Sequence, residues 1–179
     1  IIVNPSSQFA EGLEAQLVLD PPVPLYGRDA LVLEANSRDY AQRVPKINEN
    51  AQSLVTWLRE QPAVNRVYYP DGDQVDRYAP FVKPGGGRGP LLSILLKHPE
   101  QSTEAFFDAL GVSKGPNLGT NYTLACPFTI LAHYNELAFA EQCGVSRYLV
   151  RVSVGLEPLE DLYERFHAGL EAITNRPDA

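Results

Sequence analysis

A single arginine stands in the middle of an apolar segment near the C-terminal end of the sequence. Residues 147–154 alternate with a period of two, so that a tyrosine and three valines share one face while Arg151 lies with Ser153 on the other. Burying an unpaired charge is very costly, and a planar guanidinium binds a carboxylate or phosphate through two parallel hydrogen bonds. Arg151 therefore either holds a structural Asp or Glu or faces a cleft that receives an anionic ligand. Spacing alone favours the structural ion pair.

A polar loop precedes this segment. Residues 114–124 read Lys-Gly-Pro-Asn-Leu-Gly-Thr-Asn-Tyr-Thr-Leu, a stretch interrupted by glycine that carries asparagine, tyrosine and two threonines. Small polar groups on a loop beside a strand arginine suit the recognition of a small molecule that bears both charges. The loop and Arg151 together are the candidate binding site.

Other residues capable of chemistry give weaker signals. The run Gly85–Gly89 precedes a strand and lacks the Lys-Ser or Lys-Thr of a phosphate loop, so it is interpreted as a flexible lead into a hairpin. The three histidines have no metal-ligand spacing, and His133 is expected to be a core or capping residue. Cys126 and Cys143 are too few for a zinc site or a disulfide framework, and we expect two reduced, buried thiols.

Composition bounds the class of protein. The 179 residues are 44% hydrophobic, enough for one good core, and carry a net charge of −7 with scattered basic residues. This argues against a nucleic-acid or anionic-membrane surface, and no apolar run has the length of a transmembrane helix. The sequence has no methionine and begins Ile1-Ile2-Val3, so we expect a piece of a longer protein with functional residues upstream.

Helices and strands are expected to alternate irregularly. Apolar periodicity and breaker residues predict helices at 9–19, 29–40, 47–61, 102–110 (capped by Ser102) and from 157 onward, and strands at 64–69, 91–96 and 147–154. Residues 71–89 are expected to form a loop. The pattern predicts an α/β fold with a small sheet covered by helices, and not a doubly wound nucleotide-binding fold.

Three segments, in order, resemble motifs of the pyridoxal-phosphate enzymes of cysteine and methionine metabolism. Residues 149–157, LVRVSVGLE, resemble the C-terminal LVR(L/I)SVG(L/I)E signature, 117–124 resemble the SLGG-x-ES-L loop, and 64–70 resemble the V-x-x-V-x-YP strand. The variants at 34–39 and 129–134 are most similar to fungal cystathionine gamma-synthases.

The resemblance implies the C-terminal domain of a fold type I pyridoxal-phosphate enzyme, with a small, mainly antiparallel sheet covered by helices. Residues 1–45 would be the tail of the large cofactor domain and the start of the inter-domain helix, and 46–179 the substrate-side domain. The Schiff-base lysine of the S-x-T-K segment is expected upstream of Ile1. The chain itself is therefore expected to hold no catalytic, cofactor-binding or metal-binding residue, to bind no pyridoxal phosphate alone and to be inactive alone.

The resemblance also assigns site residues. In the family the motif arginine, here Arg151, binds the α-carboxylate of the amino-acid substrate, which reverses the structural interpretation drawn from spacing. The serine of the loop corresponds to Thr123, expected to seat the same carboxylate or lie near the cofactor. The preceding glutamate, which shapes specificity in bacterial members, corresponds to Tyr122. The expected substrate-binding residues are thus Arg151, Thr123, Tyr122 and Asn121.

The implied activity of the full-length protein is pyridoxal-phosphate-dependent γ-substitution: cysteine replaces the leaving group of an activated homoserine ester and gives cystathionine, a step of transsulfuration and methionine biosynthesis. Expected partners are small amino-acid substrates, the missing N-terminal domain and further copies in a cytoplasmic homotetramer, with neither nucleic acid nor membrane. The alternatives are a truncated, non-catalytic binding or assembly module, a simple small-molecule-binding α/β domain, and a related sulfhydrylase, lyase or γ-substitution enzyme of secondary metabolism.

Overall fold

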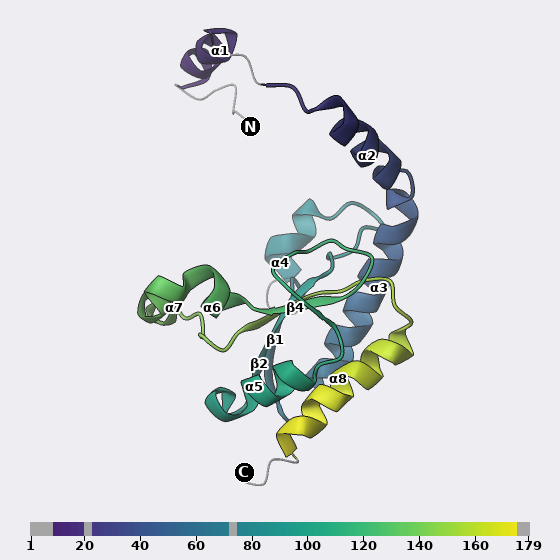
Figure 1. Ribbon diagram of the computed structural model, residues 1–179, viewed down its shortest axis with the longest axis vertical. Helices are drawn as coiled ribbons and strands as arrows, with labels where there is room; N and C mark the ends of the chain where they lie inside the picture. The colour runs from purple at the N-terminus through teal and green to yellow at the C-terminus, as the bar shows by residue number, and fades with distance from the viewer. Residues whose placement is uncertain (1–8, 20–22, 72–74, 175–179) are drawn as a thin grey trace. The chain divides into compact units, whose positions relative to one another are not determined.

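Two units make up the chain in the computed structural model, residues 1–40 and 41–179 (Figure 1). The structure describes residues 9–19, 23–71 and 75–174. The first unit contains helices α1 (Ala10–Leu19) and α2 (Gly27–Ser37), close to the helices expected at 9–19 and 29–40. The assignment of residues 1–45 to a cofactor domain stays a prediction.

A five-stranded sheet forms the centre of the second unit. Its strands are β1 (Val64–Tyr68), β2 (Leu91–Leu96), β3 (Ser113–Lys114), β4 (Leu124–Pro127) and β5 (Val150–Ser153), in the order β1-β2-β5-β4-β3. Only the short β3 runs parallel to its neighbour, and the other pairs are antiparallel. The predicted small, mainly antiparallel sheet is confirmed.

Three helices supply the core on one face of the sheet. They are α3 (Tyr40–Arg59), α5 (Pro99–Ala109) and α8 (Leu159–Thr174). Strand residues of even number in β2 and β5, such as Ile94 and Val152, are fully buried against them because alternate side chains of a strand point to one face. Trp57 of α3 stacks on Tyr163 of α8 with ring centroids 5.3 Å apart. The opposite face of the sheet carries Arg151 and is not the face that these three helices cover.

The amphipathic stripe of α3 accounts for its place in the core. The expected apolar positions are all buried: Ile47, Ala51, Leu54, Val55 and Leu58. The helix begins at Tyr40, before the expected start, and includes Pro45 near its N-terminal end. Packing of this stripe contributes about 1.5–3 kcal/mol for each fully buried large apolar side chain.

Several local expectations are wrong. Residues 71–89, expected as loop, contain helix α4 (Val75–Tyr78) and the 3₁₀ turn η2 (Ala79–Phe81). The segment after β4, for which no element was expected, forms α6 (Phe128–His133), η3 (Tyr134–Glu136) and α7 (Leu137–Gln142). These pieces are too short to show a period.

The cap of α5 also differs from expectation. His98, with a φ of 48°, precedes the helix, and Pro99 occupies its first turn. Ser102 lies inside the helix, where its hydroxyl hydrogen-bonds to the carbonyls of Lys97 and His98, 2.7 and 2.8 Å away. The proline sets the start because its fixed φ and missing N–H suit the first helical position.

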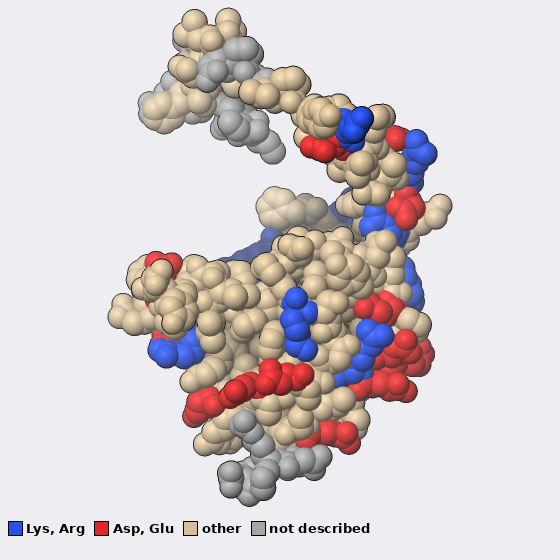
Figure 2. All heavy atoms as spheres, viewed as in Figure 1, with Lys and Arg blue, Asp and Glu red and all other residues tan. Residues whose placement is uncertain are grey.

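Charges on the second unit are mixed. Figure 2 shows acidic and basic side chains interspersed on the visible face, with acidic groups in a row over α5, where Glu100, Glu104 and Asp108 are exposed. Over the ranges that the structure describes, no helix is long and apolar enough to cross a membrane.

Candidate functional site

Arg151 lies in the middle of β5, on the sheet face away from α3, α5 and α8. Its neighbours across the strands are Ser93 of β2 and Cys126 of β4. The guanidinium carbon lies 5.3 Å from the ring centroid of Phe128. Among the described residues no carboxylate pairs with Arg151, so the structural ion pair that spacing alone favoured is absent there.

Backbone carbonyls of the polar loop hold the guanidinium. Nη2 of Arg151 donates to the carbonyl oxygen of Pro116 at 2.5 Å and to that of Asn117 at 3.4 Å. A guanidinium carries five N–H donors in a rigid fork. Both bonds use Nη2, and no described residue takes the donors on Nε and Nη1, which are therefore available to an anion within the described part of the chain.

The residues that follow Arg151 fasten the rest of the loop. The backbone N–H of Gly119 donates to Oγ of Ser153 at 3.0 Å, and the N–H of Leu156 donates to the carbonyl of Asn121 at 2.8 Å. Gly119 adopts a φ of +74°, which glycine reaches without strain. Strand and loop are therefore joined by repeated short bonds and not by side-chain packing alone.

Gly155 brings the two segments into direct backbone contact. A Cβ atom at this position would lie 2.5 Å from the carbonyl carbon of Tyr122 and 2.7 Å from the carbonyl oxygen of Asn121. No real Cβ tolerates such distances, so the site requires glycine. The N–H of Gly155 also donates to Oγ1 of Thr123 at 3.0 Å.

Glu157 clamps the end of the loop. Its carboxylate accepts a hydrogen bond from the N–H of Thr123 at 2.6 Å and another from the hydroxyl of Thr123 at 2.9 Å. Nη1 of Arg165 lies 3.7 Å from Oε1 of Glu157. Sequence reasoning missed this role and interpreted Glu157 as the opening residue of the last helix.

Asn50 holds the same turn from the other side. The side chain is fully buried in α3, and its Nδ2 donates to the carbonyls of Gly155 at 3.1 Å and Glu157 at 2.9 Å. Its Oδ1 has no hydrogen-bond partner in the described part of the chain. Sequence reasoning missed Asn50 too, although a polar residue between the buried Ile47 and Leu54 marks the position.

The predicted site residues thus fall into two groups. Thr123 is 1% exposed and engaged with Glu157, and Oδ1 of Asn121 accepts from Nη1 of Arg43 at 2.9 Å. Tyr122 is 51% exposed, and Arg151 retains open donors. Asn121, Tyr122 and Thr123 belong to the loop whose carbonyls hold Arg151. Of the four, only Arg151 is among the residues that line the pocket described next, and contact of any of them with a substrate stays a prediction.

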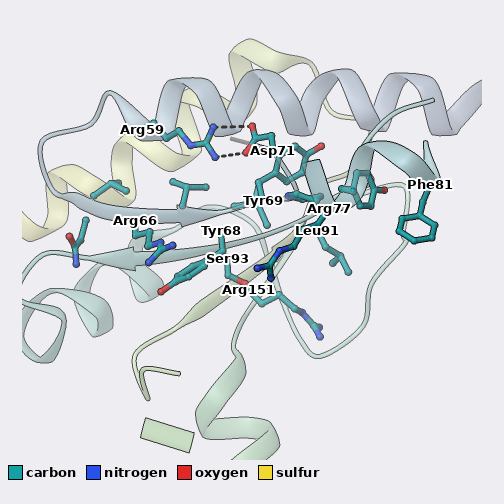
Figure 3. Close-up of a pocket in the computed structure, with 16 residues that line it drawn as sticks. Arg59, Arg66, Tyr68, Tyr69, Asp71, Arg77, Phe81, Leu91, Ser93 and Arg151 are labelled. Carbon is teal, nitrogen blue, oxygen red and sulfur yellow. Dashed lines mark hydrogen bonds and ion pairs between the residues drawn. The ribbon is translucent and has the colours of Figure 1, made fainter. Parts of the chain in front are cut away.

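A pocket of ≈1040 Å³ opens on the Arg151 face (Figure 3). Figure 3 shows Arg66, Tyr68, Ser93 and Arg151 along its floor, which matches their positions on neighbouring strands. Arg77 also lines it. The guanidinium of Arg66 lies 4.7 Å from the ring centroid of Tyr68. The floor therefore offers positive charge to an anionic ligand.

The far wall of the pocket is fixed by an ion pair and a tyrosine. Arg59 donates to both carboxylate oxygens of Asp71, at 2.9 and 2.5 Å, and these bonds raise the pKa of Arg59. The hydroxyl of Tyr69 donates to the carbonyl of Gly89 at 2.9 Å. Burial, and then the charge of Asp71, raise the pKa of Tyr69 to about 12. The wall is therefore formed by groups that already have partners: Arg59 is paired with Asp71, and Tyr69 is bonded to Gly89.

Lysines do not form part of this site. Nζ of Lys114 donates to the carbonyl of Leu110 and lies 5.1 Å from the ring centroid of Phe107, and Lys46 pairs with Glu49 at 3.1 Å. No lysine is among the residues that line the pocket. The described residues that line this pocket therefore do not fit the attachment site of pyridoxal phosphate, and the expectation of a Schiff-base lysine upstream of Ile1 stays a prediction. In the part of the chain that is described, no cluster of three His, Cys, Asp or Glu could hold a metal ion.

The two cysteines are both free but differ in environment. Cys126 is buried beside Arg151, and burial raises the pKa of its thiol while the nearby guanidinium opposes the shift. Cys143 is exposed, so the expectation that both thiols are buried is wrong for it. His133 lies at the end of α6 and not in the core, with 38% of its side chain exposed. Its Nδ1 lies 2.6 Å from Oε1 of Glu136.

Comparison with known proteins relates this geometry to one enzyme family. The family described as Cys/Met metabolism PLP-dependent enzyme matches residues 29–171. The cystathionine gamma-synthase of Neurospora crassa is 40% identical over 171 residues, covering 95% of this chain and 27% of that protein. The cystathionine gamma-synthase of Saccharomyces cerevisiae is 40% identical over 154 residues, covering 82% of this chain and 24% of that protein.

Solved structures give the same relationship. Cystathionine gamma-lyase from Lactobacillus plantarum complexed with L-serine matches with a TM-score of 0.76 and 25% identity, over 84% of this chain and 40% of that one. Cystathionine gamma synthase from Xanthomonas oryzae pv. oryzae in complex with cystathionine matches with a TM-score of 0.67 and 28% identity, over 76% and 36%. The chain spans less than a third of the length of the Neurospora crassa and Saccharomyces cerevisiae relatives.

Proposed function

Because this chain belongs to the family of Cys/Met metabolism PLP-dependent enzymes, we propose that it is the substrate-side part of a cystathionine gamma-synthase-like enzyme. The full-length protein joins cysteine to an activated homoserine ester and gives cystathionine. The names of the fungal relatives support this reaction. Residues 1–45 then belong to the end of the cofactor domain, and 46–179 to the substrate-side domain.

The observation that carries the proposal is the environment of Arg151. Its guanidinium is fixed from one side by two loop carbonyls, while donors remain toward an open pocket of ≈1040 Å³. A substrate α-carboxylate binds Nη1 and one N–H of Nη2, in place of the longer bond to Asn117. Charge-assisted bonds of this kind are roughly twice as strong as neutral ones. They fix both the position and the direction of the amino acid.

Orientation is the contribution that this chain makes to the reaction. Holding the α-carbon and the γ-leaving group in one geometry removes much of the entropy cost of reaching the transition state. Pyridoxal phosphate, when bound, supplies an electron sink for the substrate. No residue of this chain is assigned to hold it, and the lysine is proposed to lie in the part of the protein outside this chain.

An assay of the full-length protein tests the proposal. Purified enzyme with pyridoxal phosphate is incubated with cysteine and, separately, with O-acetyl-, O-succinyl- and O-phospho-L-homoserine, and cystathionine is measured by mass spectrometry. We expect cystathionine with at least one ester, at a rate that depends on cysteine concentration. Cofactor-loaded enzyme that makes none from any ester contradicts the proposal.

A second candidate is γ-elimination, the reaction class of the lyase from Lactobacillus plantarum, whose structure this chain resembles with a TM-score of 0.76. Tyr122 also stands where bacterial family members carry a specificity-determining glutamate. A second incubation of the same enzyme, with cystathionine as the sole substrate, separates the two activities. A lyase releases a keto acid and ammonia from cystathionine without added cysteine, whereas the synthase consumes ester and cysteine in equal amounts.

A further inference from the structure

We infer that Glu157 is a positioning residue that holds Arg151 in place through the loop 116–123, and that Thr123 acts through Glu157 and not by contact with the substrate. The inference rests on the proposed role of Arg151 as the ligand of the substrate α-carboxylate. It concerns how that ligand is kept in one orientation.

The hydrogen-bonding capacity of Thr123 is already used. A threonine hydroxyl has one donor, and that of Thr123 points to Oε2 of Glu157 at 2.9 Å. Oγ1 of Thr123 also accepts a hydrogen bond from the N–H of Gly155 at 3.0 Å. A substrate carboxylate can only accept hydrogen bonds, so Thr123 would have to abandon Glu157 to reach it. With 1% of its surface exposed, Thr123 is also out of reach of a ligand.

Glu157 is well placed to serve as an anchor. Its side chain is 13% exposed, and the carboxylate accepts two short bonds from Thr123, with Arg165 at 3.7 Å to balance the charge. The backbone at Glu157 is held by the buried Asn50 of α3 and leads directly into α8. The backbone that carries this carboxylate is therefore attached to two helices of the core.

The loop carries this constraint to Arg151. Positions 119, 121 and 123 are each bonded to the end of β5 or to the turn that follows it, through Ser153, Leu156 and Glu157. The carbonyls of Pro116 and Asn117, which accept from Arg151, start the same short loop. If the bond at 123 is lost, these carbonyls can shift and the guanidinium samples several orientations. The cost is weaker and less uniform binding of the substrate.

Double-mutant cycles in the full-length, cofactor-loaded enzyme test this chain of contacts. Glu157→Gln keeps the shape but turns an N–H₂ group toward a donor, and we expect kcat/KM for the active homoserine ester to fall about 10-fold, chiefly through KM. Thr123→Val should have a similar effect, and Thr123→Ser, which keeps the hydroxyl, should recover most of it. Glu164→Gln, at an exposed glutamate of α8, is the matched control and should change nothing.

Two double variants, Glu157→Gln with Arg151→Ala and Glu157→Gln with Thr123→Val, test whether these residues act through one another. In an Arg151→Ala background, Glu157→Gln should lower kcat/KM less than about 2-fold, because its effect passes through the arginine. Thr123→Val and Glu157→Gln together should cost little more than either alone. A role limited to overall stability would instead lower the melting temperature and reduce activity by the same factor in every background.

Three results would overturn the inference. Independent, multiplying losses from Glu157→Gln and Arg151→Ala would show that Glu157 does not act through Arg151. A full Thr123→Val loss that persists beside Glu157→Gln would show direct substrate contact. Arg151→Ala with unchanged kcat/KM would remove the proposed role of the arginine itself, an outcome distinct from the first two. If Glu157→Gln does not fold, Glu157→Asp takes its place in the same cycles.

Discussion

At the level of single residues, Arg151 combines a fixed position with open donors. Its strand neighbours and the carbonyl of Pro116 define where the guanidinium lies. No described carboxylate neutralises it, and the pocket beside it contains further arginines, Arg66 and Arg77. A charge held in this way is costly unless an anion completes it, which is why the arginine is the first target for substitution.

Substitution of Arg151 in the full-length enzyme should lower catalysis and leave the fold and the cofactor content nearly unchanged. Lysine keeps the charge but loses the planar fork, so Arg151→Lys should lower kcat/KM by about 10-fold or more. Arg151→Ala should lower it by about 100-fold or more, as expected for loss of a bond to a charged group in a desolvated site. Steady-state kinetics measure both variants. An alanine variant with normal kinetics but a much lower melting temperature would assign Arg151 to structure alone.

Tyr69 makes stability sensitive to alkaline pH. Burial raises its pKa from 10.0 to about 12, so between these values the unfolded chain releases the phenolic proton while the folded chain keeps it. The free energy of unfolding should therefore fall as pH rises from about 10 to about 12. Tyr69→Phe should make this alkaline decline shallower, measured as the urea midpoint against pH. An identical pH dependence in both proteins would contradict the assignment.

At the level of elements, strand β5 and the turn after it join the sheet to the polar loop. The bonds made by Ser153, Leu156 and Glu157 follow one another along the chain. Between them Gly155 allows backbone contact with Asn121 and Tyr122. The valines of this segment therefore pack in the core, while Ser153, Leu156 and Glu157 bond to the polar loop.

Gly155→Ala should destabilise the protein, because its Cβ would lie 2.5 Å from backbone atoms that cannot move aside. Overpacking of this kind costs about 1–3 kcal/mol. Gly115→Ala is the matched control, since its Cβ meets only a leucine methyl at an ordinary 3.9 Å. Urea unfolding of both variants gives the comparison. Equal stability of the two variants would show that strand and loop separate easily.

At the level of the whole molecule, apolar surface is unevenly distributed. More exposed large hydrophobic side chains lie between Phe9 and Tyr40 than in the remaining described residues, among them Val18, Val23 and Leu31. Helix α2 has no buried residue. Exposed apolar surface on this scale is typical of a contact region, which agrees with the proposal that this segment belongs to the end of the cofactor domain.

The isolated 179-residue chain should therefore bind a hydrophobic dye or self-associate. A shortened chain that begins at Ala41 should bind much less dye, because the apolar segment 9–40 has been removed. Dye fluorescence and sedimentation measure the two properties. Equal dye binding by the long and short chains would place the exposed apolar surface in the second unit instead.

Local patterns in the sequence determined much of this fold. Period-two alternation identified the arginine strand, and a short apolar run identified β2 as a buried strand. The apolar stripe from Ile47 to Leu58 identified α3, because side-chain direction repeats regularly along a helix. The family motifs located the polar loop and Arg151. These features depend on neighbours a few residues apart, and a single sequence contains that information.

Only the tertiary structure decided how these residues are connected. Thr123 meets Glu157 across 34 residues, and Asn50 reaches Gly155 across 105. Arg151 was expected from spacing to pair with a carboxylate and instead binds the carbonyls of Pro116 and Asn117. No local period encodes such pairings, because a hydrogen bond needs a distance and an angle that the folded chain alone supplies.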